Sequence, residues 1–206
     1  GTFYDQFGSG LLFRSWEDRT LGLNNALVGA RATYNFKDYV AVKVLWGIPR
    51  LGTGNDDGEF FGLGLTKVNV GGADLSISLS DIFGMGNVNL ALEGSVLNRH
   101  ETVREDFKVN GFKANNIGWS GRVNFEHEGF FAKGEYVDAG TQAISVSMPS
   151  VKGNAQLIEL GYNGRGLGLT VTGRRMKHMT QKLSMFDESL VTTTNNLLSY
   201  RPAMTT

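Results

Sequence analysis

The sequence predicts an all-β protein whose strands form an antiparallel, up-and-down β-barrel that crosses a membrane. Three observations predict this class. Apolar and polar residues alternate with a period of two in many segments, short turns alternate with longer links, and glycine is abundant while proline is scarce, with 28 Gly and 3 Pro among 206 residues. A period of two places successive side chains on opposite faces of a strand, so each predicted strand has one apolar and one polar face.

The clearest alternation lies between residues 26 and 48. Segment 26–36 carries Ala, Val, Tyr and Phe at even positions and Gly, Arg, Thr and Asn at most odd positions. A short Lys37-Asp38 turn follows, and segment 40–48 alternates again, with Trp46 on its apolar face and Lys43 on its polar face. The two segments therefore predict a β-hairpin.

The same alternation continues toward residue 174. It predicts strands over 61–66, 73–80, 88–96, 117–126, 130–136, 158–162 and 167–174. Gly71-Gly72 favours a two-residue hairpin turn, and further turns are expected at Glu128-Gly129 and Gly164–Gly166. A weak strand over 101–109 is also inferred, because without it the short turns would not all lie at the same end of the barrel. About eleven or twelve strands fit a chain of this length in a single domain, residues 1–206.

Two kinds of protein share this alternation, a soluble β-protein with its apolar face inward and a membrane barrel with that face toward lipid. Aromatic residues beside the short turns, such as Tyr34, Phe36 and Phe130, favour the membrane barrel because such rings form a girdle at the headgroup level. The polar face then lines the lumen. The lumen-facing candidates are Arg31, Lys43, Glu93, Arg122, Lys133, Glu135, Glu159 and Arg174.

These candidates carry both signs of charge. A pore that selects ions of one sign is expected to be biased toward the opposite sign. A mixed set is more typical of a cross-strand network in which opposite charges pair and stabilise the wall. The network is the favoured interpretation, and a selective lumen remains the alternative.

The sequence offers little for catalysis or cofactor binding. His100, His127 and His178 are isolated, and none has a second histidine at metal-binding spacing. The acidic segment 55–59 lacks the spacing of a calcium loop, so a polar turn is expected there. We therefore predict no catalytic, cofactor-binding or metal-binding residue, no cofactor and no enzyme activity. A formal net charge of zero with scattered basic residues gives no basis for nucleic-acid binding.

The first part of the sequence carries a resemblance. The segment FYDQFGSGLLFRSWEDRTLG, followed by LVGARATY and VKVLWGIPR, resembles the barrel region of a Bacteroidota outer-membrane β-barrel protein family of uncharacterised function. The resemblance implies a location in the outer membrane of a Gram-negative bacterium, with lipopolysaccharide and phospholipid around the barrel and other envelope proteins as partners. It also implies that the chain is part of a longer protein, and it supplies no functional residues.

Three functions remain open at this point. The first is a structural or accessory subunit of an envelope assembly, such as the machinery for barrel insertion or protein export. The second is a porin-like channel or transporter for small solutes, and the third and least favoured is a barrel enzyme at the membrane surface. Residues 6–16, which include FGSG, are expected to form an irregular edge or seam strand of the wall, or a strand that is buried against another element on both faces.

Overall fold

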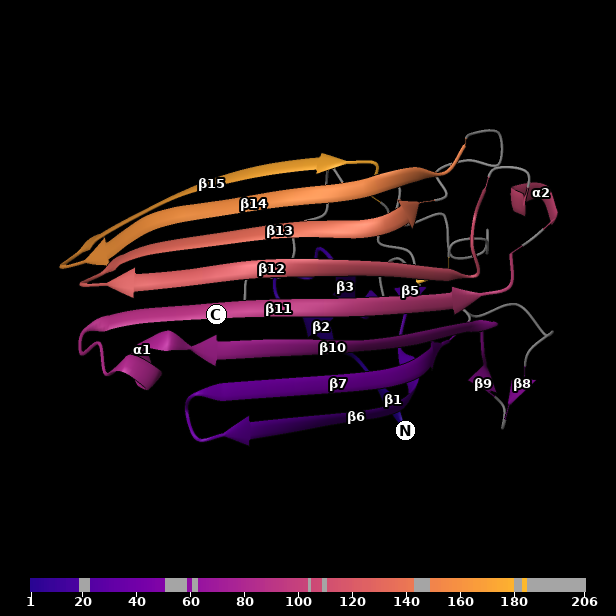
Figure 1. Cartoon of the computed structure of the whole chain (residues 1–206), viewed down its shortest axis with the longest axis horizontal. Helices are drawn as coiled ribbons and strands as arrows, with labels where there is room; N and C mark the ends of the chain where they lie inside the picture. The colour runs from indigo at the N-terminus through magenta and orange to yellow at the C-terminus, as the bar shows by residue number, and fades with distance from the viewer. Residues whose placement is uncertain are drawn as a thin grey trace.

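The computed structural model describes residues 1–18, 23–50, 59–60, 63–103, 105–108, 111–142, 149–179 and 183–184. A nine-stranded antiparallel sheet dominates it, with the order β1-β6-β7-β10-β11-β12-β13-β14-β15 (Figure 1). From β6 to β15 each strand lies beside the next long strand in the chain. The expected all-β fold with up-and-down antiparallel strands is therefore confirmed.

The strands of this sheet differ mainly in length. They are β1 (Thr2–Phe3), β6 (Leu27–Phe36), β7 (Val40–Pro49), β10 (Val68–Ser78), β11 (Val88–Glu101), β12 (Asn115–His127), β13 (Phe130–Gln142), β14 (Val151–Gly164) and β15 (Leu167–Lys177). Three pairs of two-residue strands lie outside it: β2 (Gln6–Phe7) with β3 (Phe13–Arg14), β4 (Glu17–Asp18) with β5 (Leu23–Asn24), and β8 (Glu59–Phe60) with β9 (Leu63–Gly64). Two short helices connect strands, α1 (Leu79–Phe83) before β11 and α2 (Glu105–Lys108) before β12.

The sheet is open within the described residues. Strand β15 pairs only with β14, and β6 pairs with β7 along its length and with β1 at Leu27 and Val28. No pairing joins β15 to β6 in the part of the chain that the structure describes. The sheet is thus a curved wall with two edges, and β6, β7 and β10 to β15 are its long strands.

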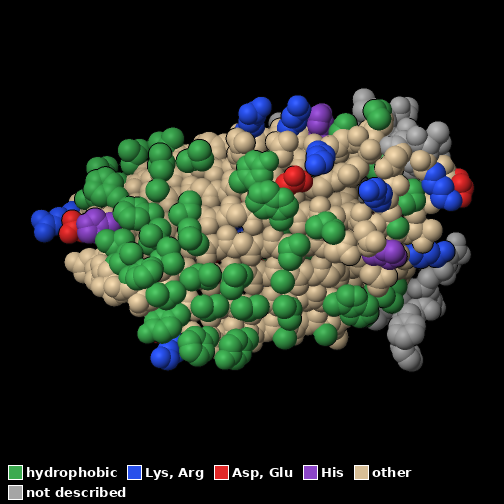
Figure 2. Space-filling model, in the orientation of Figure 1, with side chains coloured by type: hydrophobic (Ala, Val, Ile, Leu, Met, Phe, Trp, Pro, Cys, Tyr) green, Lys and Arg blue, Asp and Glu red, His purple; other side chains and the backbone are tan. Residues whose placement is uncertain are grey.

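The two faces of the sheet have opposite character. Residues 4–16, which we call the plug, pack against one face of the sheet. We call this face the inner face. The outer face is apolar and exposed, and Figure 2 shows hydrophobic side chains spread across it with few charges among them. The large exposed hydrophobic residues of this face include Tyr34, Val44, Trp46, Leu92, Val96, Ile117, Trp119, Val123, Ile158, Leu160, Leu169 and Val171.

Three of the expected short turns are present. The β6–β7 turn contains Lys37 at φ 50°, and the β12–β13 turn contains Glu128 at 49° and Gly129 at 86°. The β14–β15 turn contains Arg165 and Gly166, also at positive φ. In the β12–β13 and β14–β15 turns both central residues have positive φ, which gives the backbone twist that a two-residue hairpin requires.

The expected turn at Gly71-Gly72 is wrong. Strand β10 runs straight through both glycines and pairs there with Leu45 and Trp46 of β7. A Cβ on Gly72 would lie 2.7 Å from Cε2 of Phe7 in the plug and 2.9 Å from the Val96 carbonyl oxygen. Glycine is needed at position 72 because an aromatic ring presses on the strand, and the chain reverses direction later, through α1.

The expected strand over 101–109 is also wrong. Strand β11 extends to Glu101 and pairs directly with β12, from Val88 opposite His127 to His100 opposite Asn115. That pairing leaves no place between the two strands for another one. The connection instead contains α2, in which Glu105 and Lys108 form an i,i+3 ion pair.

For residues 6–16 the expected edge or seam strand of the wall is wrong, whereas the alternative, burial against another element, agrees with the structure. The segment folds back on itself as the β2–β3 hairpin and lies against the inner face of the sheet. Phe7, Leu11, Leu12 and Phe13 are each at most 6% exposed. Burial on both sides explains the poor alternation, because a segment inside the wall has no solvent face or lipid face.

Candidate functional site: a polar interior behind a plug

The plug is held in the interior by a small apolar core. The Phe7 and Phe13 rings pack with centroids 5.1 Å apart, and both join a cluster with Leu45 and Leu97 of the wall. Leu12 packs over Gly118 of β12, where a Cβ would lie 2.8 Å from the Leu12 Cδ1. Wall glycines thus make room for the large side chains of the plug.

The glycines of the plug have their own structural cause. Gly8 has a φ of 52° and Gly10 a φ of 83°, and the Gly10 amide donates to the Phe7 carbonyl at 2.9 Å to close the turn. A Cβ on Gly8 would lie 2.4 Å from the Arg122 Cδ atom. The FGSG sequence therefore forms a tight turn pressed against a wall arginine.

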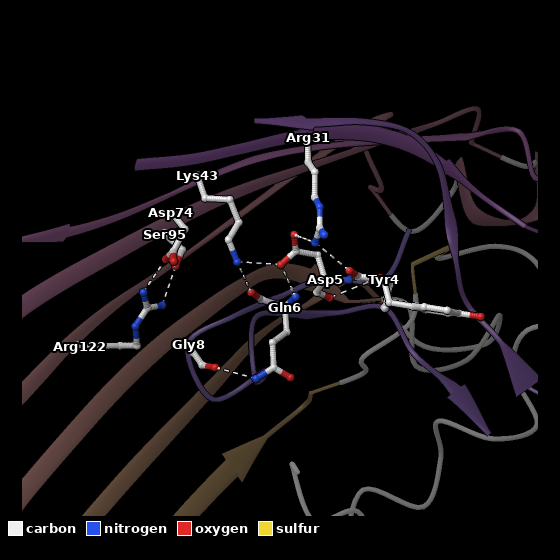
Figure 3. A network of polar contacts seen from close by, with 10 residues as sticks. Tyr4, Asp5, Gln6, Gly8, Arg31, Lys43, Asp74, Ser95 and Arg122 are labelled. Carbon is white, nitrogen blue, oxygen red and sulfur yellow. Dashed lines mark hydrogen bonds and ion pairs between the residues drawn. The ribbon is translucent and has the colours of Figure 1, made fainter. Parts of the chain in front are cut away.

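A cluster of charges fixes the start of the plug (Figure 3). Lys43 Nζ donates to Asp5 Oδ1 at 2.7 Å, and Arg31 Nη1 donates to Asp5 Oδ2 at 3.0 Å. Lys43 also donates to the Gln6 carbonyl oxygen at 3.3 Å. The Asp5 side chain is 4% exposed, while that of Arg31 is 52% exposed. Two wall cations therefore clamp one plug carboxylate.

The clamp changes the acidity of Asp5. Burial alone would raise the pKa of its carboxyl group, but the hydrogen bonds from Lys43 and Arg31 outweigh that effect and hold the pKa below its usual value of 3.8. Asp5 is therefore a carboxylate at neutral pH. Its charge neutralises part of the positive charge that Lys43 and Arg31 bring to the interior.

A second network is centred on Arg122 of β12. Its Nε donates to Glu93 Oε2 at 2.6 Å, its Nη1 donates to Ser95 Oγ at 2.6 Å, and its Nη2 pairs with Asp74 Oδ1. The side chain is 5% exposed. Ser95 Oγ in turn donates to Asp74 Oδ1 at 2.6 Å. One guanidinium group thus ties β10, β11 and β12 together beneath the Gly8 turn.

A cavity of about 440 Å³ lies between the plug and strands β11 to β15. Gln6, Gly8 and Ser9 of the plug form one side of it. The wall side contains six ionisable residues, three acidic and three basic: Glu93, Arg122, Lys133, Glu135, Glu159 and Arg174. The interior is therefore filled at one end by apolar contacts and left partly hollow at its charged end.

The structure places the eight lumen candidates in two groups. Six of them line this cavity, and the other two, Arg31 and Lys43, hold Asp5. Several are cross-strand neighbours: Glu93 lies opposite Arg122, and Lys133 lies opposite Glu159 with 3.8 Å between the charged groups. Opposite charges therefore face one another on adjacent strands in this part of the wall.

Sequence analysis missed the partners that complete these networks. Gln6 belongs to the segment expected in the wall and Asp5 directly precedes it, while Asp74 and Ser95 fall in the predicted strands 73–80 and 88–96 without an assigned role. The one available signal was the broken alternation of residues 6–16. That irregularity indicates a segment outside the wall, but it does not say which wall residues the segment contacts.

The histidines lie at strand ends and in a connection. His100 Nδ1 is 2.9 Å from Asn115 Oδ1, and His127 Nδ1 is 3.3 Å from the Asn87 carbonyl oxygen. Among the described residues there is no group of three or more His, Cys, Asp and Glu side chains that would hold a metal ion. Residues 55–58 of the acidic segment lie outside the described residues.

No helix in the described ranges has the length and apolar character needed to cross a membrane.

Fold and interior together define a class of protein: an all-β chain with an open antiparallel sheet, an apolar outer face and a polar inner face covered by its own N-terminal hairpin. The chain belongs to DUF6029, a family of unknown function, which it matches over residues 1–206. No curated protein matches the chain. No solved structure matches it either.

Proposed function

We propose that this chain forms part of the wall of an outer-membrane β-barrel and acts as a structural or accessory subunit of an envelope assembly. The observation that carries the proposal is the outer face. Its side chains are large, apolar and exposed on all eight long strands, as at Tyr34 (67%), Ile117 (60%) and Leu169 (60%). Soluble monomers rarely expose an apolar surface of this extent, whereas a barrel wall presents one to lipid.

The aromatic residues support the same assignment. Phe36 and Tyr39 lie beside the β6–β7 turn with ring centroids 6.4 Å apart, and Phe130 and Tyr162 lie near the next two tight turns at 4.6 Å. Rings at strand ends suit the boundary between acyl chains and headgroups. Phospholipid and lipopolysaccharide are the lipids that an outer-membrane wall would contact, and the resemblance noted above points to that membrane.

The plug favours a structural role over a channel. It buries four large apolar side chains against the inner face and is clamped there through Asp5. A segment held in this way obstructs the path that a porin-like channel needs. The cavity of about 440 Å³ beside the plug is the feature that keeps a transporter for small solutes as the second candidate.

Tryptophan quenching tests the membrane assignment. Trp46 and Trp119 lie on the outer face at 52% and 48% exposure, and Trp16, the third tryptophan of the chain, lies in the plug. Three variants, each with one Trp retained and the others changed to Phe, are folded into vesicles of acyl-brominated phosphatidylcholine. We expect strong quenching of Trp46 and Trp119 and weak quenching of Trp16. Equal quenching of all three would overturn the proposal.

Conductance separates the structural subunit from the channel. The chain in a planar lipid bilayer is expected to be silent, whereas a Phe7→Ala/Phe13→Ala variant, which loosens the plug, is expected to show intermittent current. Tyr4→Ala, which removes a plug side chain that is 40% exposed, serves as the matched control and should remain silent. Discrete, regular steps from the unmodified chain would favour the transporter.

A further inference from the structure

The connection between β10 and β11 differs from the other connections at its end of the sheet. Figure 1 shows its helix, α1, at the same end as the three tight turns. Each of those turns has a charged residue at its tip: Lys37, Glu128 and Arg165. The connection through α1 instead exposes three apolar side chains: Ile82 (45%), Phe83 (69%) and Met85 (39%).

Capping hydrogen bonds define the shape of this connection. Ser78 caps α1, because its Oγ atom accepts from the Asp81 amide at 3.4 Å and donates to the Asp81 carboxylate. The Met85 amide donates to the Ser80 carbonyl oxygen at 2.9 Å, and Gly84 ends the helix in the left-handed conformation at φ 61°. The apolar side chains are therefore exposed by a defined backbone.

The connection also covers a short edge of β11. Strand β10 pairs with β11 only as far as Ala91, whereas β12 pairs with it as far as Val88. The residues of β11 before Ala91 therefore have no strand on the β10 side. There the Ser80 hydroxyl donates to Asn89 Oδ1 at 3.4 Å, and the Val88 amide donates to the Met85 carbonyl oxygen at 3.3 Å. The connection is thus part of the margin of the wall.

This margin lies level with the aromatic rings at the strand ends. The Ser78 amide donates to the Tyr39 carbonyl oxygen at 2.8 Å, so α1 begins beside the Phe36 and Tyr39 pair. Such rings suit the boundary between acyl chains and headgroups. Apolar side chains beside one carboxylate, that of Asp81, suit the same boundary better than the acyl interior, where a charge is costly.

We propose that residues 79–85 form a phospholipid contact at the margin of the wall, in which Ile82, Phe83 and Met85 insert at the headgroup boundary. Lipid is the occupant because the segment is bonded to two parts of the wall, at Tyr39 and at β11, and meets the same surroundings as they do. The short turns of outer-membrane barrels lie on the periplasmic side, so the contact is with the periplasmic leaflet. This inference rests on the proposed function and adds to it a segment and a leaflet.

Depth-dependent quenching tests the contact. Phe83→Trp and Glu105→Trp are each made in a chain whose three native tryptophans are changed to Phe. Both are folded into phosphatidylcholine vesicles with bromine either near the headgroups or at the ends of the acyl chains. Glu105 is the matched control, because its side chain is 86% exposed on α2, a short helix at the opposite end of the sheet. We expect bromine near the headgroups to quench Phe83→Trp about twofold more than bromine at the chain ends, and Glu105→Trp to be quenched weakly by both.

The variant that retains only Trp46 separates this inference from the proposed function. If Trp46 is quenched and Phe83→Trp is not, the wall lies in lipid and the inference is overturned. Quenching of neither tryptophan would overturn the proposed function together with the inference. Equal quenching of Phe83→Trp by the two bromine positions would contradict its place at the boundary.

Substitutions at Phe83 test lipid against a protein as the partner. In vesicles that contain no other protein, Phe83→Ser should raise the equilibrium constant of unfolding by about tenfold, because an apolar ring is lost from the boundary. Phe83→Tyr should leave the constant nearly unchanged, since tyrosine suits the headgroup level. An unchanged constant for both variants would mean that Phe83 meets water or a protein partner, and the inference would be wrong.

Discussion

Individual glycines of the wall lie where the plug leaves no room for a side chain. Adjacent Gly71 and Gly72 in β10 face opposite sides, and only Gly72 meets the plug. A Cβ at Gly71 would have its nearest neighbour at 3.8 Å, on the Trp46 ring, whereas one at Gly72 would lie 2.7 Å from Phe7. Alanine at Gly71 therefore tests the effect of a methyl group on the strand alone, whereas alanine at Gly72 also tests its effect on the plug.

Gly72→Ala is expected to destabilise the folded chain by about 1–3 kcal/mol, the usual cost of overpacking a filled interior. Gly71→Ala should change the free energy of unfolding little. Urea unfolding followed by tryptophan fluorescence measures both. Combining Gly72→Ala with Phe7→Leu, which shortens the opposing side chain, should recover part of the loss. Equal effects of the two alanine variants would contradict the plug's position.

The ionisation of Asp5 is expected to make the stability of the folded chain depend on pH in the acid range. The pKa of Asp5 is lowered in the folded state relative to 3.8, so around this pH the folded state binds fewer protons than the unfolded state. The stabilisation is fully present above pH 3.8 and is lost as the pH falls through the lower, folded-state pKa. Urea midpoints measured between pH 7 and pH 2 should therefore fall more steeply for the unmodified chain than for Asp5→Asn. Parallel curves for the two proteins would contradict the clamp.

At the scale of elements, Arg122 couples three strands to the plug. Removing one partner of a buried salt bridge leaves the other charge unpaired, which typically lowers the free energy of unfolding by about 3–5 kcal/mol. Arg122→Leu is expected to destabilise by roughly this amount, because Asp74 and Glu93 lose their counter-ion. A triple variant with leucine at Arg122, Asp74 and Glu93 should lose less stability than Arg122→Leu alone, because it leaves no carboxylate without its counter-ion. Thermal unfolding of the single and triple variants measures the difference.

The strands and their two faces could be predicted because a period of two is a local property of the sequence. Lys43 and Trp46 are assigned to opposite faces without knowledge of any other segment. The plug could not be predicted in this way, because its position depends on contacts with distant residues such as Leu97 and Gly118. Gly71-Gly72 shows the same limit, since a glycine that makes room for a ring and a glycine that forms a turn look alike in sequence.

At the scale of the whole molecule, the plug and the size of the wall constrain each other. A closed barrel of eight strands has an interior just wide enough for its own side chains. The eight long strands here form an open sheet that already carries a hairpin and a cavity on its inner face. Within the described residues, β15 has no strand on its far side and β6 has only β1, and in lipid such backbone groups would be costly to leave unpaired. A membrane wall of this kind therefore needs both edges paired.

Charge substitutions on the two faces test which face meets lipid. Leu92 lies on the outer face at 45% exposure, and Thr33 is an exposed residue of the inner face. In a bilayer, Leu92→Arg should destabilise the folded state by ~2–4 kcal/mol because it puts a cation among acyl chains, while Thr33→Arg should be milder. Ser95 would be a poor control, because it is buried and bonded to Asp74 and Arg122.

The same pair of variants distinguishes the soluble alternative. If the outer face met water, Leu92→Arg would replace one exposed side chain with another and change the free energy of unfolding by about 0.5 kcal/mol or less. Denaturation of both variants in phosphatidylcholine vesicles, with tryptophan fluorescence as the signal, gives the two values. A large loss confined to Leu92→Arg is the result expected of a lipid-facing wall, and similar small effects on both faces would return the chain to the soluble class.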